Sequence, residues 1–338
     1  MRFVAKNARE YRGKWLSPAT YRGWRDIGLL GYRMQPGEKQ GKYQVGLPDT
    51  TCRVRNKERN RAYVDLAIHT GLRRSENTSL LVCELPPQQV DEPVEFWLPP
   101  AITKGGNGRM LLETPGAALA VHKYIIGERR DAIANARAAQ RYESGDWLLI
   151  ESVHRSAQHG LRVKWADGGR YASLDSVPPA TRARLLIRTD DGVEPMALWL
   201  TERGVPMNGW AWNAVFKTAN RRYADECRRV GVPLLSVSAH SLRFSYALMY
   251  LIALHRHIDK IEGYSFSDTY DYTRYHRAYR RVQVQLGHKD LTTTRQRYLE
   301  AIVDMRDDDL LLGAAGDLGA TLVALAARTS LVRADADE

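Results

Sequence analysis

The stretch that most constrains this fold begins at His240 and continues as one long helical pattern. His240 and Arg243 are three residues apart, so on a helix their side chains project from the same face. The residues that follow recur at the i, i+3, i+4, i+7 and i+8 spacing of a buried stripe. The members of this stripe are Phe244, Ala247, Leu248, Leu251 and Ile252. The sequence therefore predicts a core helix whose first turn carries two side chains able to bind phosphate.

A second imidazole and a phenol follow downstream. His288 comes directly after Leu286 and Gly287. The threonines at 292–294 offer helix-capping chemistry, and Tyr298 falls in the turns that come next. The order along the chain is thus imidazole, guanidinium, imidazole, phenol. We predict that these four groups converge on one point.

Two further cationic side chains lie upstream. A helical pattern from about residue 60 ends at Gly71, and Arg73 and Glu76 follow at a spacing that lets the carboxylate hold the guanidinium. An ordinary surface ion pair would show the same spacing. Residues 94–98 and 109–113 have the pattern of two strands around a glycine-rich turn, which predicts a hairpin that presents Lys104. A solvated lysine is the alternative there.

Composition sets the broad class. The chain has 338 residues, 44% of them hydrophobic and 26% charged, which allows about two domains with a sizeable core. No apolar run approaches the ~18 residues of a membrane span, and the amino terminus has no secretory pattern. Cys52, Cys83 and Cys227 are too scattered for a disulfide framework or a zinc site. We expect a cytoplasmic protein with no membrane partner.

The charge distribution is informative. The net charge is +11, and residues 1–61 hold 15 Lys and Arg against 5 Asp and Glu. Residues 301–338 hold 3 basic and 8 acidic side chains. A basic amino-terminal segment with an acidic tail is typical of nucleic-acid binders, although a solvated surface has the same signature. His255 and His257 lack companion ligands at metal-binding spacing, so neither a metal nor a cofactor is expected.

Taken together and in this order, these motifs resemble the tyrosine recombinase (phage integrase) family. They are Arg73 in GLRRSE, Lys104 in a hairpin, HSLR at 240–243, LGH at 286–288 and Tyr298. The resemblance covers roughly residues 45–300. It implies a mainly α fold with a small antiparallel sheet or hairpin (α+β), similar to the catalytic domain of DNA breaking–rejoining enzymes. It also implies double-stranded DNA as the partner and a homotetramer on that DNA.

The chemistry of a metal-free phosphodiester cleavage assigns a role to each group. A phenol with a pKa of about 10 needs cations and a base to act as a nucleophile. Tyr298 is the expected nucleophile, and Arg73 and Arg243 neutralise the phosphate, with Glu76 supporting Arg73. The resemblance implies the remaining roles. These are proton acceptance by His240, a hydrogen bond to phosphate from His288 and protonation of the departing 5′ oxygen by Lys104.

The expected organisation has three parts. Residues 1–55 form a basic arm or the remnant of a core-binding domain, since the family has a helical clamp domain upstream. Aromatic side chains in this arm, such as Trp15 and Trp24, could lie on DNA or pack on the next domain. Residues 56–312 form the catalytic domain, with insertions near 143–195 and 255–282. Residues 313–338 form a carboxy-terminal tail or helix, which docks in cis or on a neighbouring protomer.

Three functions fit this pattern. The leading one is a site-specific recombinase or integrase of a mobile element, which cuts and rejoins DNA through a 3′-phosphotyrosyl intermediate. A type IB topoisomerase-like enzyme shares the same catalytic logic. A DNA-binding accessory protein that depends on a partner recombinase is favoured by the short amino-terminal segment, whereas the complete catalytic set argues against it.

Overall fold

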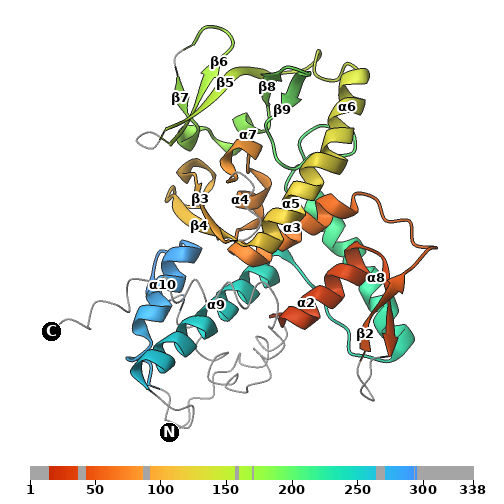
Figure 1. Ribbon diagram of the computed structural model, residues 1–338, viewed down its shortest axis with the longest axis vertical. Coiled ribbons are helices and arrows are strands. Elements are labelled where there is room, and N and C mark those ends of the chain that lie inside the picture. Colours follow the sequence, from red (N-terminus) through yellow and green to blue (C-terminus); the bar gives the residue numbers. More distant parts are fainter. Residues whose placement is uncertain are drawn as a thin grey trace, which may run out of the picture. The chain divides into compact units, whose positions relative to one another are not determined.

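The protein is a mixture of helices and small sheets (Figure 1). The computed structural model describes residues 15–36, 43–86, 92–156, 160–169, 171–263, 271–292 and 294. Within them lie two two-stranded sheets and one five-stranded sheet, set among helices of very different lengths. The predicted α+β class is confirmed. None of the described helices has the length and apolar character to cross a membrane.

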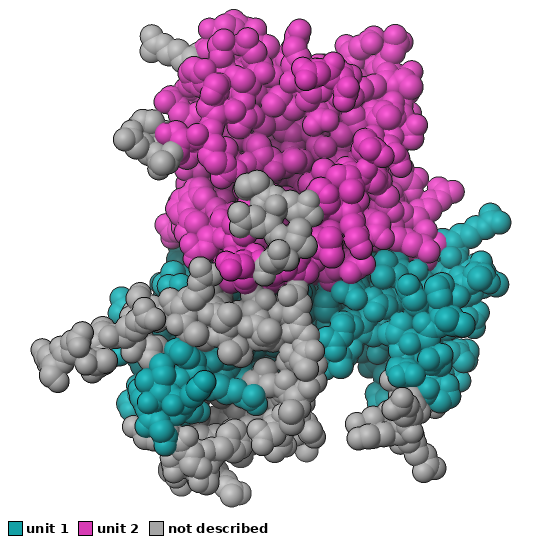
Figure 2. Space-filling model, viewed as in Figure 1, with its two compact units in different colours: residues 1–53, 67–71, 218–338 teal, residues 54–66, 72–217 magenta. Residues whose placement is uncertain are grey.

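The chain divides into two compact units, each built from separate segments of the sequence (Figure 2). Unit 1 contains residues 1–53, 67–71 and 218–338. Unit 2 contains residues 54–66 and 72–217. The predicted boundaries after residues 55 and 312, and the predicted insertions, stay predictions.

Unit 1 begins with a capped helix and a hairpin. Ser17 accepts a hydrogen bond from the Thr20 amide (3.1 Å), and Pro18 suits the first helical position, so α2 (Pro18–Trp24) starts there. A π-helical turn, η1 (Arg25–Leu29), leads into the antiparallel strands β1 (Tyr32–Pro36) and β2 (Tyr43–Pro48). Trp24 is fully buried and donates its indole N–H to Asn220 (2.8 Å). Of the two alternatives for Trp24, contact with DNA or packing within the protein, the structure shows packing.

Two helices dominate the carboxy-terminal part of unit 1. Ser238 caps α9 (Ala239–Glu262), which ends at Gly263 in the left-handed region (φ 70°). The predicted single buried face is too narrow, because every residue from Ser241 to Leu251 is buried. Helix α10 (His276–Leu286) ends at Gly287, again left-handed (φ 61°), and packs against α9. Helix α8 (Ala211–Val230) has its carboxy-terminal part in this unit.

Unit 2 contains most of the remaining elements. Helix α3 (Lys57–Thr70) has most of its length here and ends at left-handed Gly71 (φ 66°), as predicted. The predicted hairpin is confirmed as β3 (Val94–Leu98) and β4 (Arg109–Glu113), in the register Val94↔Glu113 to Leu98↔Arg109. The other helical segments are α4 (Arg74–Thr78), η2 (Val82–Glu84), η3 (Pro100–Ile102), α5 (Pro115–Tyr124), η4 (Ile125–Arg129) and α6 (Arg130–Ala138).

Residues 143–195 hold the larger sheet. Its strands are β5 (Leu148–Ser156), β6 (Gly160–Trp165), β7 (Ala172–Ser173), β8 (Leu185–Thr189) and β9 (Gly192–Pro195). The spatial order is β7-β6-β5-β8-β9, and β5 pairs with β8 in parallel while the other pairs are antiparallel. The expected small antiparallel sheet is therefore accompanied by a mixed one. The short segments η5 (Leu174–Ser176) and α7 (Pro179–Arg182) lie between β7 and β8.

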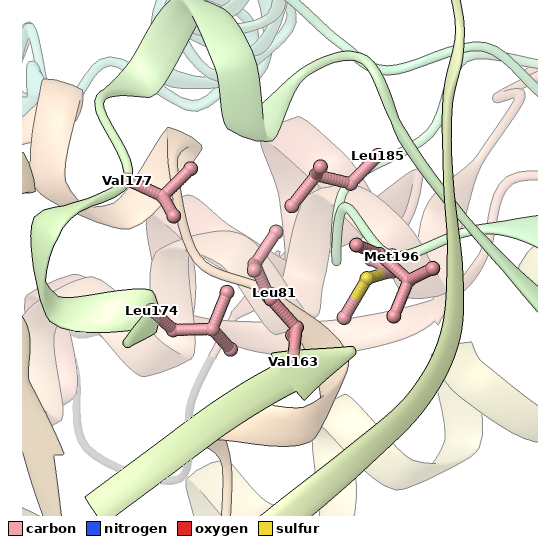
Figure 3. Close-up of a cluster of buried hydrophobic side chains, with 7 residues drawn as sticks. Leu81, Val163, Leu174, Val177, Leu185 and Met196 are labelled. Atoms are coloured by element: carbon pink, nitrogen blue, oxygen red, sulfur yellow. The ribbon is translucent and has the colours of Figure 1, made fainter. Parts of the chain in front are cut away.

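Side chains of this sheet pack into a hydrophobic core cluster (Figure 3). The cluster comprises Leu81, Ile150, Val163, Leu174, Val177, Leu185 and Met196. Beside it, the fully buried Arg182 pairs with Glu84 (2.6 Å) and donates to the carbonyls of Val177 and Leu174. Burial raises the pKa of Glu84, and the guanidinium opposes that effect. The ion pair and the apolar cluster together attach the sheet to the segment around Leu81.

Candidate active site

Arg73 stands at the amino-terminal cap of α4 in unit 2. Its backbone N–H donates to Glu76 Oε2 (2.8 Å), and its guanidinium Nη1 donates to Glu76 Oε1 (2.8 Å). The contact expected from the three-residue spacing is therefore present. Glu76 is fully buried, whereas the Arg73 side chain keeps 23% of its surface exposed. The carboxylate thus fixes an arginine that still reaches solvent.

A second arginine shares the same carboxylate. Arg109 opens β4, is buried, and donates through Nη2 to Glu76 Oε2 (2.7 Å) and through Nη1 to Oε1 (3.2 Å). Two guanidiniums on one carboxylate leave a net charge of about +1, which favours an anion at the exposed arginine. The sequence reasoning missed Arg109. The available signal was a charged residue at the first, inward-facing position of the predicted second strand.

Lys104 lies in the connection between β3 and β4. The turn is bent by Gly105 (φ 104°) and Gly106 (φ 71°), whose left-handed backbone suits glycine. Thr103 braces it by donating its hydroxyl to the Pro100 carbonyl (2.9 Å). The Lys104 side chain is exposed, so the turn presents its ammonium to solvent.

Arg243 is the centre of the arrangement in unit 1. It lies in the first turns of α9 with 5% of its surface exposed. Its Nη1 donates to the Gly71 carbonyl (2.5 Å) and its Nη2 to the Leu286 carbonyl (2.5 Å). These carbonyls lie at the carboxy-terminal ends of α3 and α10, where carbonyls lack helical partners and the helix dipole favours a cation. One guanidinium therefore joins two helix ends.

The two histidines lie in the same unit with different surroundings. His288 follows the left-handed Gly287, its backbone N–H donates to Gln283 O (3.0 Å), and its Nδ1 hydrogen-bonds Thr294 Oγ1 (2.9 Å). This contact fixes the ring orientation. His240 is exposed in the first turn of α9. Tyr298 lies outside the described residues, so its catalytic role stays a prediction.

The structure thus groups the predicted residues in two sets. Unit 2 brings Arg73 and Glu76 together and carries Lys104 on its hairpin. In unit 1, Arg243 donates a hydrogen bond to the carbonyl of Leu286, two positions before His288. The same guanidinium also donates to the carbonyl of Gly71, in the same unit. The catalytic roles themselves stay predictions.

Of the two histidines considered for a metal, His255 has structural partners. His255 is buried, hydrogen-bonds the Leu251 carbonyl through Nδ1 (2.7 Å) and stacks on Tyr275 (centroids 4.0 Å apart). Across the described part of the chain, no three His, Cys, Asp or Glu side chains gather as metal ligands would.

Comparison with known proteins gives a weak likeness in overall structure. No protein-family model matches the chain, and no curated protein matches it. One similar solved structure is that of XerH site-specific recombinase bound to palindromic difH substrate in a post-cleavage complex, with a TM-score of 0.41 and 14% identity. It covers 89% of this chain and 52% of that chain. The pre-cleavage complex with difH gives a TM-score of 0.41 and 13% identity, over 87% of this chain and 55% of that one. The chain thus spans about half the length of these matches.

Proposed function

We propose that this protein is a site-specific DNA recombinase of the tyrosine type. It cuts and rejoins double-stranded DNA for a mobile element and acts as a homotetramer on that DNA. The observation that carries the proposal is the buried Glu76 carboxylate, which holds the part-exposed Arg73 and the buried Arg109 together. Burying a carboxylate is costly unless it is paired, and pairing it twice leaves a positive, oriented fork for an anion.

The chemistry is a transesterification at phosphorus. The Tyr298 phenol gives its proton to His240 and attacks the phosphorus, forming a phosphotyrosyl bond while the bond to the 5′ oxygen breaks. Lys104 gives a proton to the departing 5′ oxygen, a contribution of roughly 10²–10⁴-fold. The 5′ hydroxyl of a second strand then attacks the phosphotyrosyl bond and restores the phenol. The number of phosphodiester bonds is unchanged, so the reaction needs no nucleotide cofactor.

Arg73, Arg243 and His288 stabilise the charge that develops on the non-bridging oxygens. Arginine suits this role because its planar fork matches a phosphate and stays charged throughout. A well-placed donor of this kind contributes roughly 2.7–4 kcal/mol to the transition state. The carbonyl bonds of Arg243 support this assignment, since a fork whose orientation is already fixed needs no reorganisation during the reaction.

The decisive experiment traps the covalent complex. The purified protein is incubated with fragmented host DNA and stopped with detergent, and the protein-bound fragments are recovered and sequenced. Mass spectrometry of the nuclease-trimmed adduct should find the nucleotide on Tyr298. Tyr298→Phe should bind DNA but form no adduct. Tyr171→Phe, at an exposed tyrosine of unit 2, is the matched control and should form the adduct normally.

The outcomes separate the candidate functions. Adduct formation by Tyr298→Phe would reject the assignment. Adducts with no preferred sequence, together with relaxation of supercoils, would indicate a topoisomerase-like enzyme. Absence of any adduct from the unmodified protein would favour an accessory protein. With the site known, a 5′-thiol substrate should restore cleavage by Lys104→Ala, because a thiolate leaves without a proton.

A further inference from the structure

Unit 2 has a tryptophan that is largely exposed to solvent. Trp210 is 76% exposed, although Trp212, two residues later, is fully buried and stacks on Tyr63 with ring centroids 3.5 Å apart. The buried tryptophan anchors the start of α8 in the core. Trp210 immediately precedes α8, so the anchored helix start holds the backbone that carries it, and its indole is exposed.

An arginine covers part of this indole. The Arg74 guanidinium carbon lies 5.2 Å from the centre of the Trp210 ring, a cation–π distance. Its Nη1 also donates a hydrogen bond to Asn213 Oδ1 (2.5 Å), so the cation is held by the first turn of α8. At the neighbouring Gly209, an added Cβ would meet nothing within 4 Å outside its chain neighbours, so the backbone beside Trp210 is uncovered on that side.

The chemistry of this pair matches a nucleobase. A large exposed aromatic side chain keeps apolar surface in water, and a base that stacks on the ring removes the surface that Arg74 leaves uncovered. The adjacent guanidinium favours the negatively charged strand that carries the base. Arg74 directly follows Arg73 in the chain, so their Cα atoms are about 3.8 Å apart. Adjacent residues of the chain would therefore hold the base on Trp210 and the phosphate on Arg73.

We propose that Trp210 and Arg74 form a stacking platform for an unpaired nucleobase beside the phosphate that is cut. This inference rests on the proposed function for the location of that phosphate. An unpaired base is the expected occupant because the faces of a paired base are covered by its neighbours in the duplex. The platform holds a displaced base of the broken strand while the strand awaits rejoining.

Binding measurements with three probes test the platform. They are a mixed-sequence single strand, its duplex, and the same duplex with an internal unpaired bubble, each followed by fluorescence anisotropy at low salt. Trp210→Ala should weaken binding of the single strand and the bubble by about 5- to 150-fold, which corresponds to about 1–3 kcal/mol. Duplex affinity should change by less than about twofold. Trp210→Phe should retain part of the affinity, since a smaller ring still stacks.

Trp97→Ala is the matched control, because Trp97 is a half-exposed tryptophan of the same unit whose indole N–H is bonded to Asp175 (3.1 Å). It should leave all three affinities nearly unchanged. An equal loss for the single strand and the duplex in Trp210→Ala, or an equal loss in Trp97→Ala, would overturn the platform. The two proposals fail separately, because Trp210-dependent binding of a single strand needs no covalent adduct.

Discussion

Arg73 and Arg243 are the same kind of side chain held in opposite ways. Arg73 is oriented by a charged partner, the buried carboxylate of Glu76, which it shares with Arg109. Arg243 is oriented by two neutral carbonyls, those of Gly71 and Leu286. The first arrangement depends on charge balance, and the second on the positions of two helix ends. A guanidinium can therefore be fixed either by a charged side chain or by backbone carbonyls, and the two arrangements should respond differently to mutation.

The largest expected effects come from replacing each arginine by lysine. Each variant should lower single-turnover cleavage by about 10²–10³-fold, because an ammonium cannot reproduce the fork. Only Arg243→Lys should also lower the free energy of unfolding substantially, by about 1–3 kcal/mol for each buried carbonyl left without its donor. Denaturant unfolding measures this. Equal losses of unfolding free energy in both variants would contradict this difference between the two arginines.

The next largest effect is expected from Glu76→Gln. It leaves the guanidiniums of Arg73 and Arg109 without their carboxylate, and breaking a buried ion pair costs about 3–5 kcal/mol of unfolding free energy. Replacing Glu76 and Arg109 together by methionine should recover much of this stability, since apolar side chains substitute well for a buried pair. Cleavage should stay low, because Arg73 has lost its support. Recovery of cleavage in the double variant would show that Glu76 is not what orients Arg73.

Glu113 shows how a buried carboxylate behaves without an arginine, and it predicts a pH effect. Burial raises the pKa of Glu113 to about 7, and its Oε1 has no hydrogen-bond partner among the described residues. The pKa of Glu113 is higher in the folded state than in the unfolded state. Its contribution to the free energy of unfolding is therefore complete below about pH 4 and is lost as the pH rises through 7. Glu113→Gln should therefore stabilise the protein at pH 8 by up to about 3 kcal/mol and have little effect at pH 4. The exposed Glu143→Gln is the control, and matching pH profiles for the two variants would contradict the prediction.

Local patterns predicted the local structure well. The strands at 94–98 and 109–113 have the expected bounds because their alternation and turn residues lie within one hairpin. Gly71 ends α3 as predicted, since a left-handed position after a helix strongly favours glycine. The Arg73–Glu76 contact follows from a three-residue spacing.

Contacts between distant parts of the chain were not predictable in this way. Arg109 reaches Glu76 across 33 residues, and Arg182 reaches Glu84 across 98. The parallel pairing of β5 with β8 leaves no periodic signal in the sequence, because it depends on which segments meet in the fold. The carbonyl partners of Arg243 were equally unpredictable from the sequence. Every residue carries a carbonyl, and only the fold selects those of Gly71 and Leu286. The contacts of Arg73 with charged side chains were thus partly predictable from the sequence, whereas the contacts of Arg243 with backbone carbonyls were not.

Gly71 offers the smallest and most selective test of the backbone contacts of Arg243. Gly71 (φ 66°) and Gly263 (φ 70°) share a left-handed conformation, but a Cβ on Gly71 would lie 2.4 Å from Tyr246 Cδ1, whereas a Cβ on Gly263 meets nothing within 4 Å. Gly263→Ala should lower the unfolding free energy by about 1 kcal/mol, the cost of the left-handed backbone alone. Gly71→Ala should cost at least about 1 kcal/mol more, because Tyr246 must move. It should also slow cleavage, since the displaced residue carries a carbonyl that holds Arg243. Equal stability and normal cleavage in both alanine variants would show that Arg243 does not depend on the position of this helix end.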